Sequence, residues 1–410
     1  MKNIFIFLFP LNIFAFRLGI ENMSSDFIRQ LGQSPVGIVT NQTGVDQRGK
    51  RTIDILLEKK LNIKAVFVPE HGLDGTIKAA CTVENGIDKK TGLPVTSLYK
   101  HGSGYIPSNV FSEIDAVIFD MQDVGMRHYT YISTLYTVME AAARDKKRII
   151  VCDRPNPLGN VMEGPICDAA LCSFIGIAQI PLRHGMTIGE LAQLFNNKCL
   201  KQKVDLHVLP LADYQRDIKL QTLQAHLSPN IKTLSSVHGY SFLGLLGEIK
   251  PFDVGVGTPS AFQVITLPEE HTVSLRAWEN LQKELQEFGI YSKRYSYYHK
   301  QKNRSFAGIA LQFKDINVVF GFKALLSVLS WTKKENIPVN FSPYFDKAIG
   351  TKEVRVWYKS DQMQDVLAKK ITKELHEFLR VNEDVLLYQS VPKVVKRDVL
   401  DAFLLPYCVL

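Results

Sequence analysis

The sequence predicts an α/β fold with an open parallel sheet and helices on both faces, followed by a smaller α+β half. From Val36 onward, short β-branched runs alternate with amphipathic helical stretches, which is the pattern of parallel βαβ units. Around residues 228–260 this alternation gives way to sequence rich in Gly and Pro, which indicates a junction between domains. The length of 410 residues also predicts two or three domains. We therefore expect an α/β domain at residues 30–238 and an α+β domain at residues 239–410.

The elements of the first domain are expected in a regular order. The expected strands lie at residues 36–40, 63–68, 116–119 and 148–152. Thr52 should cap a helix after the first strand, and residues 131–144 should form another after the third. The buried stripe of the first helix is expected to consist of Ile53, Leu56, Leu57 and Leu61. Thr187 and Glu190 can satisfy each other's backbone donors in a capping box, so a further helix should begin there and run through Phe195.

The second domain carries fewer but clear patterns. A strand is expected at residues 309–313, and helices are expected near residues 322–331 and 362–380. A further helical stripe, closed by Gly289, consists of Leu275, Trp278, Leu281, Leu285 and Phe288. We find no internal repeat, so a repeat protein is excluded.

The composition is that of a folded protein, with 46% hydrophobic and 22% charged residues. The net charge of +8 is spread over the whole length, so we interpret it as solvated lysines rather than as a surface for an anionic polymer. No module interleaves aromatic and basic residues, which argues against nucleic-acid binding. The six cysteines include no C-x-x-C pair, so neither a disulfide scaffold nor a zinc site is expected.

The N-terminus indicates export. Met1, Lys2 and Asn3 lead into an apolar run at residues 4–16, which we interpret as an export signal rather than a signal anchor. Elsewhere no apolar stretch approaches the ~20 residues needed to span a bilayer. We therefore expect an exported chain, periplasmic or secreted, without stable membrane insertion of the mature protein.

Cofactor binding has little support in the sequence. Gly255 and Gly257 form the only glycine pair that resembles a dinucleotide loop, but Ser260 follows and the acidic ribose partner is missing. No G-x-S-x-G elbow of a serine hydrolase exists, and no spaced set of His and Cys indicates a metal. We expect neither a cofactor nor a metal.

Polar residues crowd directly after the predicted strands. These loops lie at residues 41–44, 69–75, 120–131 and 153–157. Ligands of open parallel sheets bind beyond the carboxyl ends of the strands, so the four loops should converge on one cleft.

Glu70 is the first candidate for a proton donor, because it stands at the mouth of a buried strand where low dielectric can raise the pKa of a carboxyl group. The alternative is that Glu70 caps a turn or pairs with an arginine. His71 could orient that carboxyl group or bind substrate, although a loop histidine is more often only a local hydrogen-bonding residue.

Two further loops carry candidate binding residues. Asp120, Gln122, Asp123, Arg127 and Tyr129 supply the mixture of acceptors, donors and a ring face that a polyhydroxylated ligand needs. Either aspartate could instead cap the next helix, with Arg127 pairing to one of them. Two prolines stiffen residues 153–157, which would preorganise Arg154 and Asn156 for binding. The alternative there is a stiff turn in which Asp153 pairs with Arg154.

The loop motifs resemble those of the exo-β-N-acetylmuramidase family. The matching stretches are GIVTNQTG at 37–44, PEHG at 69–72, TGLPVTSLY at 91–99, FDMQDVGMRHYTY at 119–131, DRPNP at 153–157 and RHGMTIGEL at 183–191. The resemblance covers residues 34–196 strongly. It extends into the second half through residues 228–230 and 345–351.

The resemblance implies a Rossmann-like catalytic domain with a C-terminal auxiliary domain. It also implies a glycosidase that releases terminal N-acetylmuramic acid from peptidoglycan-derived oligosaccharides or muropeptides. The family's glutamate falls on Glu70 as acid/base, and Asp123 or Asp120 would be the second carboxylate that glycoside hydrolysis normally needs. The expected substrate-binding residues are Asn41, Gln42, His71, Asp120, Gln122, Arg127, Tyr129, Arg154, Asn156 and His184.

Two positions depart from the family pattern. Asp74 stands where the family usually has an arginine, and Val256 stands where it typically has an arginine before Gly-Thr. These departures keep open a degenerate, non-catalytic protein that binds muropeptides or glycans. An unrelated enzyme acting on a phosphorylated molecule would need a phosphate cradle at a helix N-terminus, which we do not find.

Overall fold

A mostly parallel sheet forms the centre of the N-terminal half. The computed structural model describes residues 16–100, 104, 106–218, 220, 222–360 and 364–394. In that part of the chain the sheet has seven strands in the order β3-β4-β2-β1-β5-β6-β9, and only β3 with β4 pairs antiparallel. Their bounds are β1 (Val36–Thr40), β2 (Ile63–Val68), β3 (Gly86–Ile87), β4 (Pro94–Ser97), β5 (Ala116–Asp120), β6 (Arg148–Cys152) and β9 (Leu206–Leu209).

The strand order places a switch point between β1 and β5. The parallel strands run outward from β1 through β2 and β4 on one side, and from β5 through β6 and β9 on the other. Numbered along the chain, this is the order 3-2-1-4-5-6 of the Rossmann fold, whose ligands bind at the switch point. The predicted Rossmann-like fold is confirmed, and the loops after β1 and β5 flank the expected crevice.

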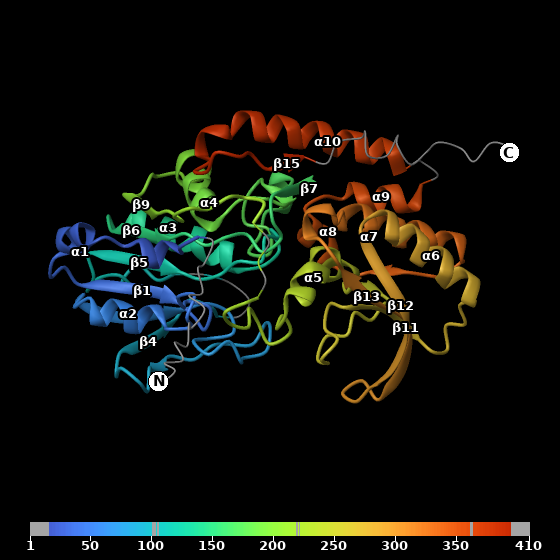
Figure 1. Ribbon diagram of the computed structural model, residues 1–410, viewed down its shortest axis with the longest axis horizontal. Coiled ribbons are helices and arrows are strands. Elements are labelled where there is room, and N and C mark those ends of the chain that lie inside the picture. The colour runs from blue at the N-terminus through green and yellow to red at the C-terminus, as the bar shows by residue number, and fades with distance from the viewer. Residues whose placement is uncertain are drawn as a thin grey trace, which may run out of the picture.

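Helices cover both faces of this sheet (Figure 1). Their bounds are η1 (Gly19–Asn22), α1 (Ser25–Leu31), α2 (Thr52–Glu58), α3 (Tyr131–Arg144), α4 (Ile188–Leu194) and the π-helical turn η3 (Phe195–Cys199). The pleat of each strand sends alternate side chains to opposite faces. In β1, Ile38 therefore joins the core under α1 and α2, whereas Val39 joins the core under α3 and α4. A separate hydrophobic core thus packs against each face of the sheet.

Three local expectations for the first domain can be compared with the structure. Thr52 is the first residue of α2 rather than its cap, because its hydroxyl is turned inward and donates to the Asp120 carboxylate. Leu57 is 36% exposed and does not belong to the buried stripe. The capping box of α4 is confirmed, with Glu190 accepting from the Thr187 backbone at 3.0 Å.

The second half is built around an antiparallel sheet in the order β11-β13-β12. These strands are β11 (Val264–Pro268), β12 (Ile290–His299) and β13 (Arg304–Phe313), and a separate pair is β10 (Ile249–Lys250) with β14 (Asn340–Phe341). The helices are α5 (Leu234–Leu246), α6 (Leu275–Glu287), η4 (Ile316–Val318), α7 (Gly321–Lys334), α8 (Phe345–Ile349) and α9 (Glu353–Lys359). The predicted α+β class is confirmed, although Leu275 is 67% exposed and lies off the buried stripe of α6.

Helix α5 occupies the region that the sequence marked as a junction rich in Gly and Pro. A Cβ on Gly239 would stand 1.7 Å from the carbonyl oxygen of Phe262, so this glycine is required for close packing rather than for a turn. The glycines in this segment therefore led to the prediction of a junction where the structure has a helix.

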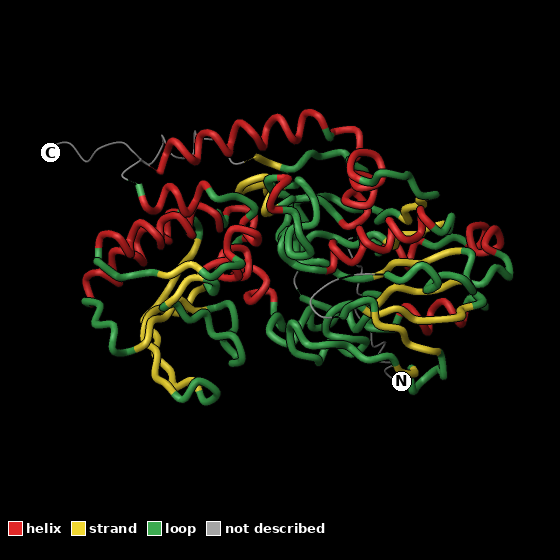
Figure 2. Tube along the Cα trace, turned by 180° about the vertical axis from the view of Figure 1, so that it is seen from behind, coloured by secondary structure: helices red, strands yellow, loops and turns green. Residues whose placement is uncertain are grey.

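The C-terminal part of the chain crosses back over the first domain (Figures 1 and 2). Helix α10 (Gln364–Val381) and the turn η5 (Glu383–Val385) lead to β15 (Lys393–Val394). Strand β15 pairs in parallel with β7 (Val161–Ile166), which pairs with β8 (Pro181–Arg183) and precedes the turn η2 (Ala169–Leu171). We call residues 387–394 the C-terminal clasp, because they join residues of the second half of the sequence to the first domain.

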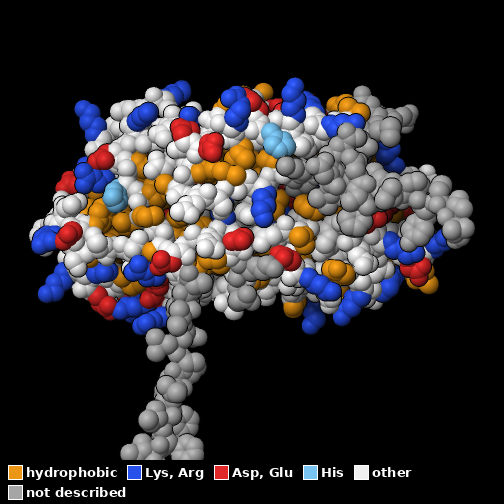
Figure 3. Space-filling view, turned by 45° about the horizontal axis from the view of Figure 1, so that its top comes forward, with side chains coloured by type: hydrophobic (Ala, Val, Ile, Leu, Met, Phe, Trp, Pro, Cys, Tyr) orange, Lys and Arg blue, Asp and Glu red, His pale blue; other side chains and the backbone are white. Residues whose placement is uncertain are grey.

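On the face shown in Figure 3, basic and acidic side chains intermingle, and no continuous basic surface is seen there. Among the described residues, no helix is long and apolar enough to cross a membrane. The segment interpreted as an export signal, residues 1–16, lies outside the described residues except for Phe16.

Candidate active site at the carboxyl edge of the sheet

The loop after β1 is fixed by its own side chains. The Asn41 Oδ1 atom accepts hydrogen bonds from the Thr43 backbone at 2.9 Å and from the Thr43 hydroxyl at 2.6 Å. The Gln42 side chain crosses to the other side of the crevice, where its Nε2 donates to the carbonyl oxygens of His226 (2.8 Å) and Leu227 (3.2 Å). Gly75 leaves room for this amide, since a Cβ there would lie 2.2 Å from the Gln42 Cδ.

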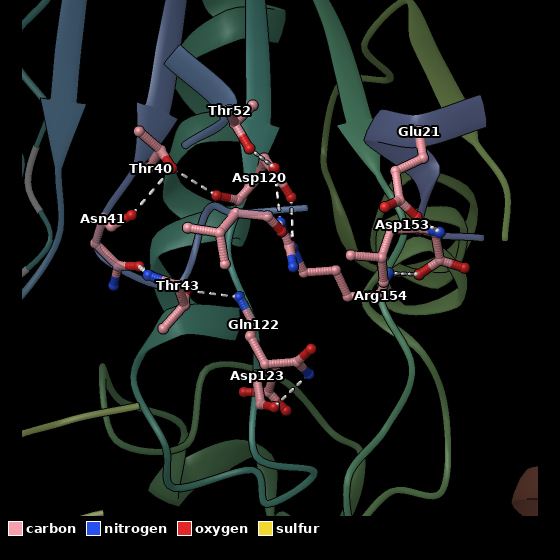
Figure 4. A network of polar contacts seen from close by, with 12 residues as sticks. Glu21, Thr40, Asn41, Thr43, Thr52, Asp120, Gln122, Asp123, Asp153 and Arg154 are labelled. Carbon is pink, nitrogen blue, oxygen red and sulfur yellow. Dashed lines mark hydrogen bonds and ion pairs between the residues drawn. The ribbon is translucent and has the colours of Figure 1, made fainter. Parts of the chain in front are cut away.

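Asp120 and Arg154 form a buried ion pair behind the crevice. The Arg154 Nε stands 2.5 Å from Asp120 Oδ1, and both side chains are at most 2% exposed (Figure 4). Arg154 also donates to the Val45 carbonyl at 2.8 Å, and the Asp120 carboxylate accepts from Thr52. The charged groups of Asp120 and Arg154 are therefore bonded to each other and to neighbouring protein groups. They do not face the crevice.

Asp123, three residues further on, has a different environment. Its Oδ2 accepts from the Gly125 backbone at 2.6 Å and contacts the His184 Nε2 at 3.3 Å. Its Oδ1 is buried and has no hydrogen-bond partner among the described residues. The neighbouring Gln122 amide donates to the carbonyls of Asp123 and Pro155, which joins the loop after β5 to the loop after β6.

Glu70 is held at the end of β2 with little exposure, 8%. Its Oε2 accepts from the Thr130 hydroxyl at 2.7 Å, and its Oε1 accepts from the Ala80 backbone at 2.9 Å. The buried Tyr99 hydroxyl also lies near this carboxylate, and burial together with the Glu70 charge and hydrogen bond raises the pKa of Tyr99. The His71 Nδ1 lies 2.6 Å from the Ile77 carbonyl oxygen, and no hydrogen bond joins this ring to Glu70 among the described residues.

Aromatic residues surround the two carboxylates. The hydroxyls of Tyr129 and Tyr131 both donate to the Leu227 carbonyl, at 2.7 and 3.0 Å. Burial raises the pKa of the Tyr240 hydroxyl, and the negative charges of Glu70 and Asp123 raise it further. Thr130, which donates to Glu70, stands in the loop after β5 that also carries Asp123, so the two carboxylates lie at the same edge of the sheet. We call these two residues the acidic pair.

Tyr240 comes from α5 of the second domain, and sequence analysis missed it. Its ring stacks on His128 with centroids 4.8 Å apart and lies 6.0 Å from the Tyr129 ring. Burial lowers the pKa of His128 to about 3, with Arg127 adding to the effect, so this imidazole is neutral near pH 7. No motif near Tyr240 could have identified it, because it is contributed by a helix far along the chain.

Two candidate residues use their side chains to bond the protein's own backbone. The Arg127 guanidinium is fully buried and donates to the carbonyls of Ile180 and Ile349, each at 2.6 Å, so it ties α8 of the second domain to the first. The Asn156 amide donates to the Met186 carbonyl at 3.0 Å and accepts from the Leu158 backbone at 2.9 Å. Both side chains thus stabilise the surrounding loops, and the Asn156 amide lies next to Gly125, whose N–H donates to Asp123.

A second buried carboxylate network, around Asp153 and Glu190, lies near the ion pair of Asp120 and Arg154. Asp153 accepts from the Gly189 backbone at 2.7 Å, from the Thr187 hydroxyl at 2.9 Å and from the hydroxyl of Tyr388 in the clasp. Burial raises the pKa of Asp153 to about 7, and the nearby Glu190 charge contributes to the rise. Glu190 is paired with buried Arg216. Within the described residues no group of three His, Cys, Asp or Glu side chains is placed to hold a metal ion.

Two family descriptions match the chain in succession. Residues 36–235 match "Exo-beta-N-acetylmuramidase NamZ, N-terminal", and residues 238–388 match "Exo-beta-N-acetylmuramidase NamZ, C-terminal". The chain belongs to the NamZ family. This confirms the resemblance seen in the loop motifs and assigns the chain to a family of glycosidases.

Relatives of this chain cover nearly its whole length. The peptidoglycan β-N-acetylmuramidase NamZ of Bacillus subtilis (strain 168) is 33% identical over 382 residues, which are 90% of this chain and 91% of the relative. Crystal structures of two DUF1343 family proteins from Bacteroides fragilis are 29% and 27% identical, with TM-scores of 0.81 and 0.74. Each covers 92% of this chain and 99% of its own.

A pocket of about 530 Å³ adjoins Gln42 in this NamZ chain. Its charged lining residues are Asp74 and Lys232, and His226 also lines it. The Asp74 side chain is exposed. The departure from the family pattern at Asp74 therefore puts a negative charge on the wall of a pocket that shares Gln42 with the crevice. The Val256 side chain is 37% exposed, and its carbonyl accepts from His299 at 2.9 Å.

Proposed function

We propose that the chain is an exo-acting glycoside hydrolase that releases terminal N-acetylmuramic acid from the non-reducing ends of peptidoglycan fragments. The observation that carries the proposal is the acidic pair: the Glu70 carboxylate accepts from Thr130 in the loop after β5, and the same loop carries Asp123 with one oxygen that has no partner among the described residues. The Bacillus subtilis relative is a peptidoglycan β-N-acetylmuramidase, which supports the substrate class.

In this proposal Glu70 is the general acid and base. It would donate its proton to the glycosidic oxygen as the bond to the leaving sugar breaks, and so prevent an unstable alkoxide from forming. Thr130 and Ala80 hold the carboxyl group in place by donating one hydrogen bond to each oxygen. Asp123, with one unpartnered oxygen, would stabilise the positive charge that develops on the sugar ring.

Aromatic side chains near the acidic pair suit a sugar. Tyr129, Tyr131 and Tyr240 line the crevice from two domains, and ring faces pack against the C–H faces of pyranose rings while their hydroxyls serve as polar contacts. We propose that Asn41 and Gln42 contact the sugar on the β1 side, where the Asn41 Nδ2 and Gln42 Oε1 have no hydrogen-bond partner within 3.5 Å among the described residues.

The deciding experiment is incubation of the purified full-length protein with a chromogenic β-N-acetylmuramide. Release of the chromophore by the wild type and its loss in Glu70→Gln support the proposal. Glu84→Gln is the matched control, because Glu84 is exposed in the same segment of the chain. If the wild type releases no chromophore, the proposed activity is wrong.

The second candidate is a non-catalytic protein that binds muropeptides or glycans, and it is favoured by the negative charge of Asp74 at the pocket. Binding of N-acetylmuramic acid by calorimetry without chromophore release would support this candidate. We also propose export of the chain, which N-terminal sequencing of the mature protein from the cell exterior or periplasm tests.

A further inference from the structure

His184 forms a hydrogen-bonded pair with Asp123, and the reaction proposed above gives His184 no role. His184 is 1% exposed, and both ring nitrogens have partners. The Met186 backbone N–H donates to Nδ1 at 3.2 Å, and Nε2 lies 3.3 Å from Asp123 Oδ2. Since Nδ1 accepts a hydrogen bond, it carries no proton in the neutral ring, and Nε2 therefore donates to Asp123.

Backbone pairing fixes the distance between these two residues. The segment that follows Asp123 runs antiparallel to β8, with the Arg127 N–H donating to the Leu182 carbonyl at 2.8 Å and the His184 N–H to the Gly125 carbonyl at 3.4 Å. Gly125 has a φ of +97°, and a Cβ there would stand 2.2 Å from the Asn156 Oδ1. The turn that presents Asp123 is thus held by the same residues that hold His184.

The two oxygens of Asp123 are therefore unequal. Oδ2 receives two donors, the Gly125 N–H at 2.6 Å and the His184 Nε2–H, whereas Oδ1 receives none. A buried carboxylate oxygen without a partner costs free energy, and the fold tolerates it where a ligand supplies the missing contact. His184 itself has no free nitrogen with which to bind a sugar.

We infer that His184 is a positioning residue, which through its Nε2–H holds Asp123 so that Oδ1 is the carboxylate oxygen presented to the substrate. The inference rests on the function proposed above, and it assigns His184 a role behind Asp123 instead of a contact with substrate.

The test compares two amides at position 184 of the full-length enzyme. The Nε2 of glutamine lies as many bonds from the backbone as the histidine Nε2, so His184→Gln can keep the donor to Asp123. His184→Asn places its amide nearer the Nδ1 position and loses that donor. We expect His184→Asn to lower kcat by roughly tenfold to a hundredfold with KM changed less than about twofold, whereas His184→Gln keeps kcat within about threefold.

The pH profile separates positioning from a general structural role. Loss of a donor disfavours the ionised carboxylate, so the acid limb of kcat/KM should move to higher pH in His184→Asn and stay in place in His184→Gln. Asp123→Asn removes the charge that His184 orients, so His184→Asn should have little further effect in that background. Equal losses in both amide variants, or a rise in KM as the main effect, overturn the inference.

A readout without catalysis distinguishes this inference from the proposed function. In protein labelled with ¹⁵N-histidine, the resonances absent from His184→Gln report the tautomer of His184 among the ten histidines. A protonated Nε2 with a bare Nδ1 supports the inference, and a protonated Nδ1 overturns it whatever the activity. A wild type with the expected tautomer but no hydrolysis contradicts the proposed function alone.

Discussion

Asp120 and Asp123 stand in one loop, but their surroundings are opposite. Asp120 is bonded to Arg154 and Thr52, and the neighbouring network of Asp153, Glu190 and Arg216 is similarly satisfied within the protein. Asp123 keeps one oxygen without a hydrogen-bond partner among the described residues, and Glu70 lies among neutral groups, the Thr130 hydroxyl, the Ala80 N–H and the Tyr99 hydroxyl, rather than beside a cation there. The two polar regions at this edge of the sheet therefore have different roles. The region around Asp120, whose polar groups are bonded to one another, stabilises the loops. The region around Asp123 and Glu70 is available to a ligand.

The largest expected effect is a loss of stability when the bonded region around Asp120 is disrupted. Arg154→Met leaves the Asp120 charge buried without its cation, which should lower the free energy of unfolding by about 3–5 kcal/mol. Urea unfolding measures the loss. The control is Arg148→Met, whose ion pair with Asp205 is exposed (47% and 64%) and should change stability by less than about 1 kcal/mol. Equal effects of the two substitutions would contradict the assignment of Arg154 to the fold.

Glu70→Gln acts on the region around Asp123 and Glu70. The amide keeps the shape of the side chain but has no proton to transfer, so kcat on a chromogenic β-N-acetylmuramide should fall by on the order of a hundredfold or more. The urea midpoint should stay close to that of the wild type. Near-normal turnover in this variant removes Glu70 from the acid role.

A smaller effect concerns pH and the contact between the two domains. His128 has a folded-state pKa of about 3, below its ordinary value of about 6.5, so the unfolded chain binds a proton that the folded chain does not. Its contribution is full above pH 6.5 and is lost as pH falls toward 3, by about 2 kcal/mol between pH 7.5 and pH 5. Asp153 has a raised pKa and acts in the opposite direction over the same window.

The measurement for His128 is therefore a difference between two proteins. Urea unfolding of the wild type and of His128→Phe is compared at pH 7.5 and pH 5, since phenylalanine keeps the stacking on Tyr240 but cannot be protonated. The wild type should lose more stability than the variant on acidification. The same pH dependence in both proteins would show that His128 is not the group responsible.

The smallest expected effect concerns Asp74. If this position meets the lactyl carboxylate of N-acetylmuramic acid, Asp74→Arg should lower KM a few-fold with less effect on kcat, because the contact is the same in ground state and transition state. Both proteins are compared on substrates with and without the lactyl group. An equal response to the two sugars shows that Asp74 does not sense the acid.

The sequence predicted much of the fold because the strands of the sheet are buried on both faces and stand out as short apolar runs. The strands at residues 36–40, 63–68 and 148–152 match β1, β2 and β6. Helix α5 was missed because its glycines serve packing and its residues are apolar around most of the helix. Thr52 was mistaken for a cap because its partner, Asp120, is distant in the sequence.

The candidate site was predictable only in part, for a related reason. Loop position places Glu70 and Asp123 at the strand ends, but it says nothing about the other bonds a side chain makes. Arg127 has the chemistry of a ligand-binding residue, and only the fold shows its guanidinium enclosed by backbone carbonyls. Tyr240 approaches the acidic pair from another domain, so no spacing in the sequence relates it to them.

The C-terminal clasp has a consequence for how the protein is made. Asp153 and Glu190 depend on Tyr388 and Leu387, which follow them by 235 and 197 residues. Synthesis proceeds from the N-terminus, so the whole Rossmann-like sheet leaves the ribosome long before the strand that completes the neighbouring small sheet. The first domain is therefore synthesised early, but its last contacts form only after the C-terminal clasp has been made. A fragment that ends at the domain junction would contain the sheet but would lack the donors that Tyr388 and Leu387 supply to Asp153 and Glu190.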